Sequence, residues 1–465
     1  MRDHGTPGRG RAFFCIRVSC EAPKFISHCN GALLRACSAF MNQPRIFITA
    51  ILIAAASAFA AGSTPSSETD KDLAELKLAV QKNEVRLKET PRSAEAARKL
   101  ATSINELSVY LAKRGQAGDF AKALELLTSS IDLREQLVKS HPAEPWAAHE
   151  ASVNLNELGG LLVRQGQPGD LDKAFAHFTR SLELTEAAVK ARPESKQAQR
   201  DVAVSSERLG VFLTRRGAEG DLEKAFTHLS RCVTISESLQ KTEPDSADAM
   251  RDLAAALERL GTFLFEREDE GDSTAALANF TRSLELREAV LKKSPDSQDA
   301  SREVSIGLEK LADFLIEYGG ESDSEKILAN LNRSLELREV LMKANPLSAQ
   351  AARDLSVALN KLGDYLATLG KPEDAIKALG HFERDLSISE KLLTANPNSA
   401  QAARDVVISH YKLANFCRST GNKAGEEKHF RACYDLLKVC AEKKLTFDQR
   451  VVELFEDLKE HFKGE

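Results

Sequence analysis

Three histidines recur in one register and are the first candidates for metal chemistry. His177 and His228 are 51 residues apart, and His381 falls in the same register three copies later. Imidazoles are common metal ligands, so a regular row of them could hold metal ions. In other copies the position carries leucine or asparagine, at Leu126, Asn279 and Asn330. We therefore interpret it as a tolerant polar position, and we expect no metal and no cofactor.

An arginine followed by an acid is the second candidate, because the pair recurs. The pairs are Arg200-Asp201, Arg251-Asp252, Arg302-Glu303, Arg353-Asp354 and Arg404-Asp405. Each arginine lies nine residues before a recurring leucine, so at about 100° per helical residue it points away from that leucine. Two interpretations stay open. The first is a ladder between adjacent units, with exposed pairs worth well under about 1 kcal/mol each. The second is a row of arginines that grips an acidic or C-terminal peptide.

The cysteines offer redox chemistry or plain packing. Four of the eight cysteines fall within the first 40 residues. Cys232 and Cys433 stand where other copies have a serine, and Cys417 occupies a core leucine position. We favour buried cysteines that pack as small apolar residues. The alternative is a disulfide from Cys417 to Cys433 or Cys440, which an exported chain would permit.

These residues belong to an internal repeat of 51 residues, which must be settled before any other interpretation. A leucine recurs at Leu107, Leu158, Leu209, Leu260, Leu311, Leu362 and Leu413. The next residue is small each time: Ser108, Gly159, Gly210, Gly261, Ala312, Gly363 and Ala414. Prolines keep the same spacing from Pro91 to Pro397.

The repeated positions predict two helices per unit, called A and B. Serines two residues after a proline, such as Ser93 and Ser195, can cap helix A. A glycine about 20 residues later, such as Gly115 or Gly319, suits the left-handed residue that ends a helix. Aspartates such as Asp221 would cap helix B. The small residue after each leucine lets the two helices approach closely.

Both ends of the array are predicted to be special. Residues 70–89 fit the phase of a B helix, so the array opens with a half-unit. Residues 446–463 form a final amphipathic helix, with a capping box of Thr446 and Gln449. Its apolar face should cover the open end of the stack. That face consists of Val451, Phe455, Leu458 and Phe462.

The chain resembles the tetratricopeptide repeat (TPR) family from residue 70 to residue 441. The family motif W-x2-L-G-x2-Y, then A-x3-F, then P, is matched at Leu158-Gly159, at Ala174 with Phe178, and at Pro193. The unit is 51 rather than 34 residues, because each helix is longer by about two turns and the loop by three residues. The resemblance implies an all-α, right-handed α-solenoid of antiparallel helix pairs. It also implies a groove, lined by the A helices, that binds a protein or peptide.

Charged residues that vary from unit to unit are the candidates for lining this groove. With the arginines of the recurring pairs, they are Lys113, Arg164, Arg200, Arg215, Arg251, Glu266, Arg302, Asp313, Glu317, Arg353 and Asp364. Their signs predict a groove that changes from basic to acidic along the chain, and a partner of opposite polarity. Arg287 and Arg338 on the B helices are expected to be exposed and outside the groove.

The N-terminal 60 residues carry a targeting signal. Arg45 precedes an apolar run, and Ala58-Phe59-Ala60 has the form of a signal-peptidase site. We predict a signal peptide at 41–60, a linker at 61–69, and a secreted or periplasmic protein. Residues 46–60 as an uncleaved membrane anchor are the alternative. Residues 1–40 are then an upstream extension or a mis-assigned start, with an organelle transit peptide as the less favoured interpretation.

Charge and motifs exclude several function classes. The first 61 residues carry a net +5, so the −5 of the whole chain leaves −10 on the remainder. An acidic array disfavours nucleic acid, whose backbone needs clustered Lys and Arg. We find no nucleophile motif or phosphate loop and expect no enzyme. The sequence favours an exported, non-catalytic interaction scaffold, with a self-associating periplasmic or membrane-tethered assembly factor as the alternative.

Overall fold

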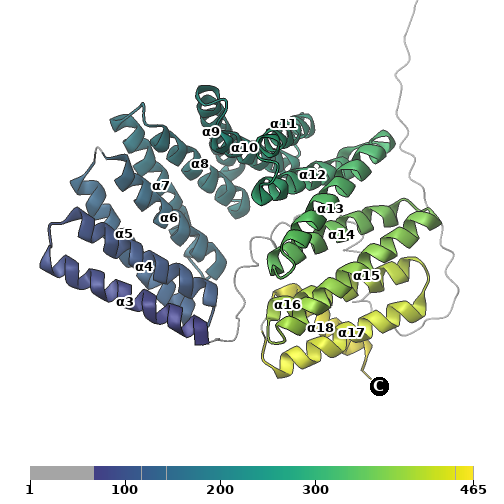
Figure 1. Ribbon diagram of the computed structural model, residues 1–465. Helices are drawn as coiled ribbons and strands as arrows, with labels where there is room; N and C mark the ends of the chain where they lie inside the picture. The colour runs from purple at the N-terminus through teal and green to yellow at the C-terminus, as the bar shows by residue number, and fades with distance from the viewer. Residues whose placement is uncertain (1–66, 117, 143, 446, 464–465) are drawn as a thin grey trace, which may run out of the picture. The chain divides into compact units, whose positions relative to one another are not determined.

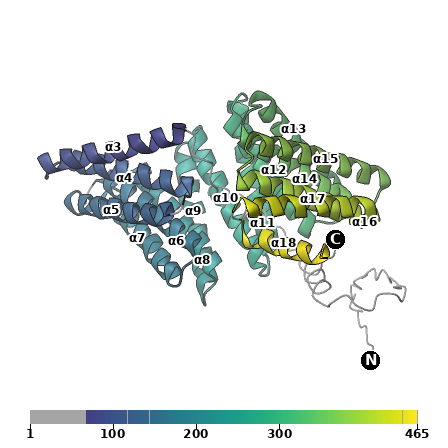
Figure 2. The ribbon, with the colours of Figure 1, turned by 90° about the horizontal axis from the view of Figure 1, so that it is seen from below.

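The computed structural model describes residues 67–463, apart from 117, 143 and 446. All of these residues belong to one compact unit. They form sixteen α-helices and one short 3-10 helix, Glu321–Asp323, with no strand among them. In Figures 1 and 2 each helix lies against its neighbours in sequence, as their contacts also show.

The helices alternate between the two expected types. The A helices are α4 (Ala94–Arg114), α6 (Pro145–Gln165), α8 (Lys196–Arg216), α10 (Ala247–Arg267), α12 (Gln298–Tyr318), α14 (Ala349–Thr368) and α16 (Ala400–Ser419). The B helices are α5 (Asp119–Ser140), α7 (Asp170–Ala191), α9 (Asp221–Thr242), α11 (Asp272–Lys293), α13 (Ser324–Ala344), α15 (Pro372–Ala395) and α17 (Lys423–Glu442). They are flanked by α3 (Ser67–Glu89) and α18 (Gln449–His461).

Serine caps begin six of the seven A helices, as the sequence predicts. The Ser93 hydroxyl accepts the Ala96 N–H at 3.2 Å, and the Ser195 hydroxyl accepts the Ala198 N–H at 3.2 Å. Ser246, Ser297, Ser348 and Ser399 make the same bond. Glu144, the exception in sequence, makes no side-chain cap. A serine cap contributes about 1 kcal/mol to a helix.

The helix ends differ from the prediction in one unit. Gly115, Gly166 and Gly217 have φ of 65°, 66° and 61°, which is the left-handed conformation expected at these ends. Glu268 adopts the same conformation, φ 59°, after α10. The prediction for Gly319 is wrong, because its φ is −74° and its backbone is extended.

The aspartates at the starts of the B helices act as clamps rather than as the predicted caps. The N-cap of α9 is Gly220, which has no side chain to cap the helix, and Asp221 is the first residue of the helix itself. The Asp221 carboxylate accepts the Ala218 N–H at 3.0 Å and binds the Arg216 guanidinium at 2.8 and 2.7 Å. Arg216 thereby holds the pKa of Asp221 below its usual value. The equivalent clamps are Asp119 with Arg114 and Asp272 with Arg267.

A close contact between each A helix and its B helix forms the centre of the core. A Cβ added to Gly159 would lie 2.8 Å from the Phe178 ring, and one added to Gly363 would lie 2.8 Å from Phe382. Glycine therefore lets the A helix lie against the aromatic ring, as the small column predicts. Two units have leucine in place of phenylalanine and a larger A residue: Ser108 with Leu127, and Ala312 with Leu331.

Terminal helices cover both ends of the described array. On α3, the Asn83 amide donates to the Ser103 hydroxyl of α4 at 3.1 Å. On α18, Val451, Leu458 and Phe462 are buried and Phe455 is partly buried against α16 and α17, as predicted. Helix α18 starts at Gln449, with Asp448 as its N-cap, so the predicted capping box is wrong. Thr446 itself lies outside the described residues.

The described chain is an all-α solenoid of stacked helix pairs. Each helix contacts the next in sequence, and successive A helices such as α6 and α8 also contact each other. Helix α3 begins three residues before the expected start of the array. The segments predicted at 1–40, at 41–60 and at most of 61–69 lie outside the described residues. No helix among the described residues is long and apolar enough to cross a membrane.

The contact of Gly159 with Phe178 predicts a coupled pair of substitutions. Gly159→Ala should destabilise the fold by about 1–3 kcal/mol, because its methyl group overlaps the ring. With Phe178→Leu added, the loss should be smaller than the sum of the single losses by at least about 0.5 kcal/mol. Urea denaturation measures these differences. Gly160→Ala is the matched control, because nothing lies within 4 Å of a Cβ there. Strictly additive losses would contradict the contact.

Candidate functional site

The recurring arginines bind the acid of the next A helix. Arg302 Nε lies 2.5 Å from Asp354 Oδ2, and Arg353 Nε lies 2.9 Å from Asp405 Oδ2. Arg200 with Asp252 and Arg251 with Glu303 are each 3.2 Å apart. Of the two interpretations of these pairs, the structure shows the first, a ladder of ion pairs between adjacent units. Four of the six arginines among the predicted groove residues, Arg200, Arg251, Arg302 and Arg353, therefore bind the chain's own carboxylates.

The ladder reaches both ends of the array. At its start, Arg98 Nε binds Glu150 at 3.0 Å. In the next unit His149 replaces arginine, and its Nδ1 lies 2.7 Å from Asp201, whose hydrogen bond raises the pKa of His149. At its end, Arg404 binds Asp448 at 2.7 Å. Asp448 is the N-cap of α18, so this helix takes the place of a further A helix.

A second ladder joins the B helices in the opposite direction along the chain. Arg180 on α7 binds Glu135 on α5, with 3.0 Å between Nε and Oε1. The later pairs are Arg231 with Glu186, Arg282 with Glu237, Arg333 with Glu288 and Arg384 with Glu339. Sequence analysis missed this ladder, although both columns keep the 51-residue spacing. Reading the columns in pairs, 45 residues apart, would have found it.

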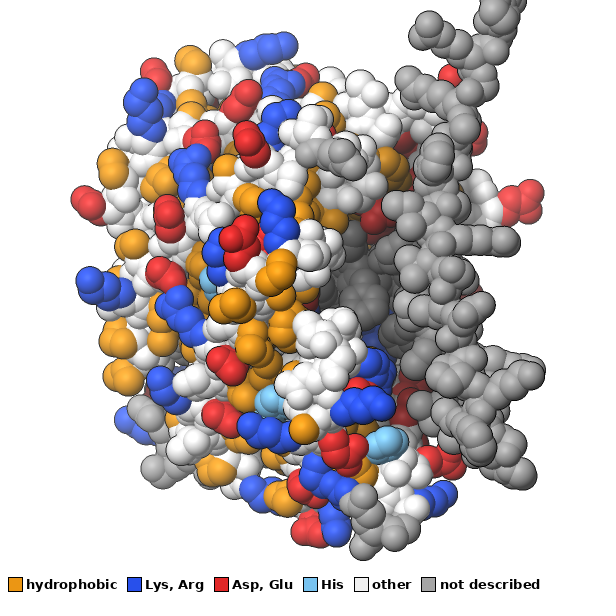
Figure 3. Space-filling model, turned by 90° about the vertical axis from the view of Figure 1, so that its right-hand side faces the viewer, with side chains coloured by type: hydrophobic (Ala, Val, Ile, Leu, Met, Phe, Trp, Pro, Cys, Tyr) orange, Lys and Arg blue, Asp and Glu red, His pale blue; other side chains and the backbone are white. Residues whose placement is uncertain are grey.

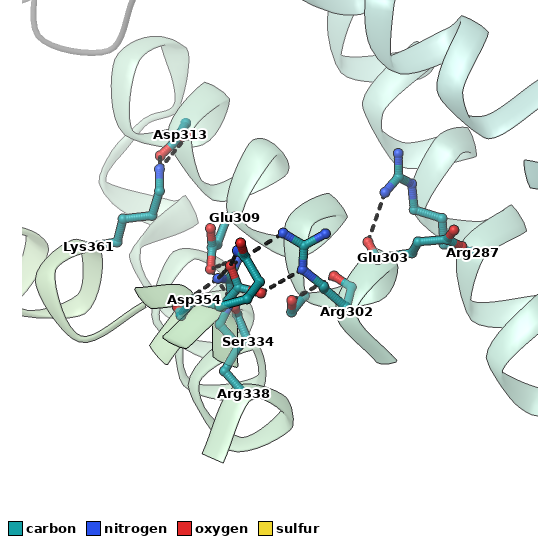
Figure 4. Close-up of polar contacts among 11 residues, drawn as sticks. Arg287, Arg302, Glu303, Glu309, Asp313, Ser334, Arg338, Asp354 and Lys361 are labelled. Carbon is teal, nitrogen blue, oxygen red and sulfur yellow. Dashed lines mark hydrogen bonds and ion pairs between the residues drawn. The ribbon is translucent and has the colours of Figure 1, made fainter. Parts of the chain in front are cut away.

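Arg287 and Arg338 are buried, so the prediction that they are exposed is wrong. Their exposed fractions are 8% and 4%. Arg338 on α13 binds Glu309 of α12 at 2.9 Å and donates to the backbone carbonyl of Asp354 on α14 at 2.6 Å. Arg287 joins α10, α11 and α12 in the same way. Each arginine therefore connects three helices, as Figure 4 shows for Arg338.

The centre of Figure 4 is a buried carboxylate. Glu309 is 5% exposed and accepts the Ser334 hydroxyl at 2.7 Å in addition to its contact with Arg338. Burial raises the pKa of Glu309, and Arg338 opposes that shift. Because an isolated buried charge is unfavourable, Arg338 and Glu309 are needed together.

Lysines of the chain already pair with two predicted groove acids. Lys361 Nζ lies 2.5 and 2.6 Å from the oxygens of Asp313, and Lys412 Nζ lies 2.5 Å from Asp364. The lysines occupy the position just before the recurring leucine, a column that sequence analysis did not use. The acidic half of the predicted gradient is thus partly compensated within the chain. Figure 3 shows Lys and Arg interspersed with Asp and Glu over the face that it draws.

Arg164 on α6 and Arg215 on α8 lack such compensation. Both side chains are exposed, and neither makes a hydrogen bond or salt bridge among the described residues. Burial by the surrounding surface lowers the pKa of both. Arg259 and Arg208 lower the pKa of Arg215 further by their positive charge. Glu157 lies near Arg164 and Glu266 lies near Arg215, but neither acid binds its arginine directly.

The remaining predicted groove residues lie at equivalent positions on other A helices. Lys113 on α4 and Glu266 on α10 are exposed, and Glu317 on α12 is half-buried. Burial raises the pKa of Glu266, which Lys310 and Arg215 oppose. The five members of this column lie on five successive A helices, and Arg215 and Glu266 are near enough to affect each other's pKa.

The one described pocket is lined by ladder residues. It has a volume of about 290 Å³, and it is lined by Arg251, Asp299, Arg302 and Glu303. Arg251 binds Glu303 across it, and Arg302 is held by Asp354. Both arginines are therefore engaged with carboxylates of the chain, and the fourth lining residue, Asp299, is an exposed acid in the first turn of α12.

Histidines and cysteines form no reactive centre among the described residues. The predicted row of His177, His228 and His381 is half-buried, and burial lowers the pKa of each. No group of three or more metal-binding side chains occurs in the described part of the chain. The shortened last unit places His429 in the same column, with Nδ1 3.0 Å from Nδ1 of His410.

The described cysteines are buried free thiols. They are Cys232, Cys417, Cys433 and Cys440. Burial raises the pKa of the Cys232 and Cys433 thiols to about 12, so neither is a reactive thiolate at neutral pH. The Cys433 Sγ donates to the Val407 carbonyl at 3.4 Å. These cysteines are buried, as we favour from the sequence, and the alternative disulfide from Cys417 to Cys433 or Cys440 is not formed.

Comparison with known proteins gives a distant likeness. No family model matches the chain. Protein NCA1 of Arabidopsis thaliana is 24% identical over 212 residues, which is 45% of this chain and 49% of that protein. The chain thus matches about half the length of this curated relative.

Similar solved structures are also helical. The S. pombe nuclear import adaptor Nro1 is 11% identical, with a TM-score of 0.44, over 68% of this chain and 99% of Nro1. The apo form of RapI is 11% identical, with a TM-score of 0.43, over 82% of this chain and 100% of RapI. At these values the likeness assigns neither a partner nor an activity.

The buried position of Arg338 predicts a large loss of stability when it is removed. Arg338→Ala should cost about 3–5 kcal/mol, because the buried Glu309 carboxyl group loses the guanidinium that it binds. Arg333→Ala, on the same helix, removes an exposed ladder pair and should cost no more than about 1 kcal/mol. Urea denaturation of both variants is the measurement. Small and equal losses would mean that Arg338 is exposed after all.

Proposed function

We propose that this protein is a non-catalytic interaction scaffold, and that it is a long-helix variant of the TPR family. The observation that carries the proposal is that some positions of the repeat stay constant from unit to unit while others, on the exposed side of the A helices, vary. Framework positions are repeated from unit to unit, such as the serine caps and the leucine of each A helix. Positions on the exposed side of the same helices change, from Arg164 and Arg215 to Glu266. A repeated framework with a variable surface is what partner recognition requires, since stacked repeats present an extended binding surface.

The ion-pair ladders limit where a partner can bind through charge. Arg200, Arg251, Arg302 and Arg353 already bind carboxylates of the chain. We therefore propose that binding depends on the A-helix residues outside the ladder. The proposed partner is a protein or peptide, and the net charge of −10 after residue 61 disfavours nucleic acid.

We also propose that the protein acts after export, guided by the signal at 41–60. The apolar run of about 15 residues is shorter than the roughly 20 that span a bilayer, which favours cleavage over anchoring. Sequencing the N-terminus of the exported protein tests this. We expect it to begin at Ala61. A protein that keeps residues 46–60 would instead be membrane-anchored.

Capture of partners by residues 61–465 tests the scaffold function. Arg164→Glu with Arg215→Glu should remove at least one partner that the wild-type chain retains, because both cations lie on the A-helix surface. Lys190→Glu with Lys241→Glu is the matched control, since these exposed lysines lie on the B helices of the same units. Light scattering of the purified chain accompanies the capture. Equal loss in both variants, or a stable oligomer that covers the A helices, would contradict the proposal.

A further inference from the structure

Three positions on α6 and the equivalent three on α8 lie on one side of their helices. On α6 they are Val153, Gly160 and Arg164, and on α8 they are Val204, Val211 and Arg215. Spacings of seven and four residues return to nearly the same side of an α-helix. Helices α6 and α8 are in contact, and we call these six residues the α6–α8 patch.

The patch exposes apolar side chains beside its cations. Val153 is 43% exposed and Val204 is 46% exposed. Single exposed valines are ordinary on protein surfaces. Here, however, two of them occupy one column on adjacent helices, and that column ends at Arg164 and Arg215.

Gly160 is the part of the patch that packing within the chain does not explain. Its neighbour Gly159 is required by Phe178, but a Cβ added to Gly160 would meet no atom within 4 Å. A glycine inside a helix is unfavourable relative to alanine, since it has more freedom to lose on folding. Glycine also lets another backbone approach closely. The open space above Gly160 therefore suits a segment that lies across α6.

The charges of the patch indicate the chemistry of that segment. Arg164 and Arg215 have no hydrogen bond or salt bridge among the described residues. Arg208, Arg259 and Glu266 all act on Arg215, and Arg259 already pairs with Glu207. Glu157 is the acid that acts on Arg164, and it is itself partly buried. A carboxylate of a partner would give each guanidinium the directly bonded anion that it lacks, whereas an added ammonium group would be repelled by it.

We propose that the α6–α8 patch binds an acidic segment of a partner protein, whose backbone crosses Gly160 and whose aliphatic side chains contact Val153 and Val204. The proposal deepens the scaffold function and depends on it. In this proposal the acidic ligand binds Arg164 and Arg215. The second interpretation from the sequence instead had the recurring arginines, now seen in the ladder, bind such a peptide. Carboxylates of the segment bind Arg164 and Arg215, which supply charge-assisted hydrogen bonds.

Binding of defined peptides to residues 61–465 tests the proposal. The probe is a fluorescein-labelled peptide of alternating glutamate and leucine, compared with one that has lysine in place of glutamate. Fluorescence anisotropy should detect binding of the acidic peptide, weakened by added salt, and much weaker binding of the basic one. Arg164→Glu with Arg215→Glu should weaken the acidic peptide at least about tenfold. The Lys190→Glu and Lys241→Glu control should leave it unchanged.

Substitution of Gly160 separates binding from folding. Gly160→Leu adds a good helix former in open space, so the melting temperature should not fall, while peptide affinity should drop at least about tenfold. Gly380→Leu is the matched control, because Gly380 on α15 also has nothing within 4 Å of a Cβ. It should leave the affinity unchanged.

Two outcomes would overturn the proposal. The first is a failure of the acidic peptide to bind, or equal binding of the acidic and basic peptides. The second is equal affinity of the Gly160→Leu, Gly380→Leu and wild-type chains. If captured partners still depend on the A helices in either case, the scaffold function stands and only the acidic partner is excluded.

Discussion

The distance between the two helices of a pair is set by a contact between a small residue and a ring or leucine. Where Gly159 faces Phe178, a single added carbon would come within 2.8 Å of the ring. This contact brings the two helices close enough to bury the recurring leucines of the A helices, such as Leu158 and Leu209. It also fixes which side of each A helix points outward. The positions of the ladders and of the α6–α8 patch follow from that orientation.

Charged residues serve two distinct purposes in this fold. Exposed ladder pairs such as Arg333 with Glu288 are individually weak, on the order of a few tenths of a kcal/mol. They nevertheless occur in every adjacent pair of B helices from α5 to α15, so they favour one register of stacking. Buried arginines such as Arg338 are different, since their loss leaves a charge without a partner. The ladder between the A helices also uses four of the eleven charged residues predicted for the binding groove.

The sequence predicts those features that depend on one helix or one loop. Serine caps such as Ser195 need only the residues that follow them, and the buried face of α18 follows from its own periodicity. Buried Arg287 could not be predicted in this way, because its partners lie 29 residues before it and 16 residues after it on other helices. The exposed position predicted for it rested on helix B alone. Gly319 shows the same limit, since the 3-10 turn after α12 changes its backbone.

The candidate surface was predicted only in part. Arg164 and Arg215 were readable as a variable column, but pairing of Asp313 with Lys361 was not, because it joins two columns across two helices. The importance of Gly160 needed the structure, which distinguishes it from the packed Gly159 beside it. Sequence periodicity treats the two glycines as neighbours in one helix. Only the atoms around each glycine show that one is required for packing and the other is open.

Site-specific photocrosslinking of the protein to its partner tests the central claim most directly. A photoreactive amino acid would replace Val204 on α8 or, in a second variant, Val340 on α13, which is 65% exposed. If the A helices bind the partner, irradiation should produce a crosslinked partner from position 204 and none from position 340. A crosslink from position 340 alone, or equal crosslinks from both positions, would contradict the account.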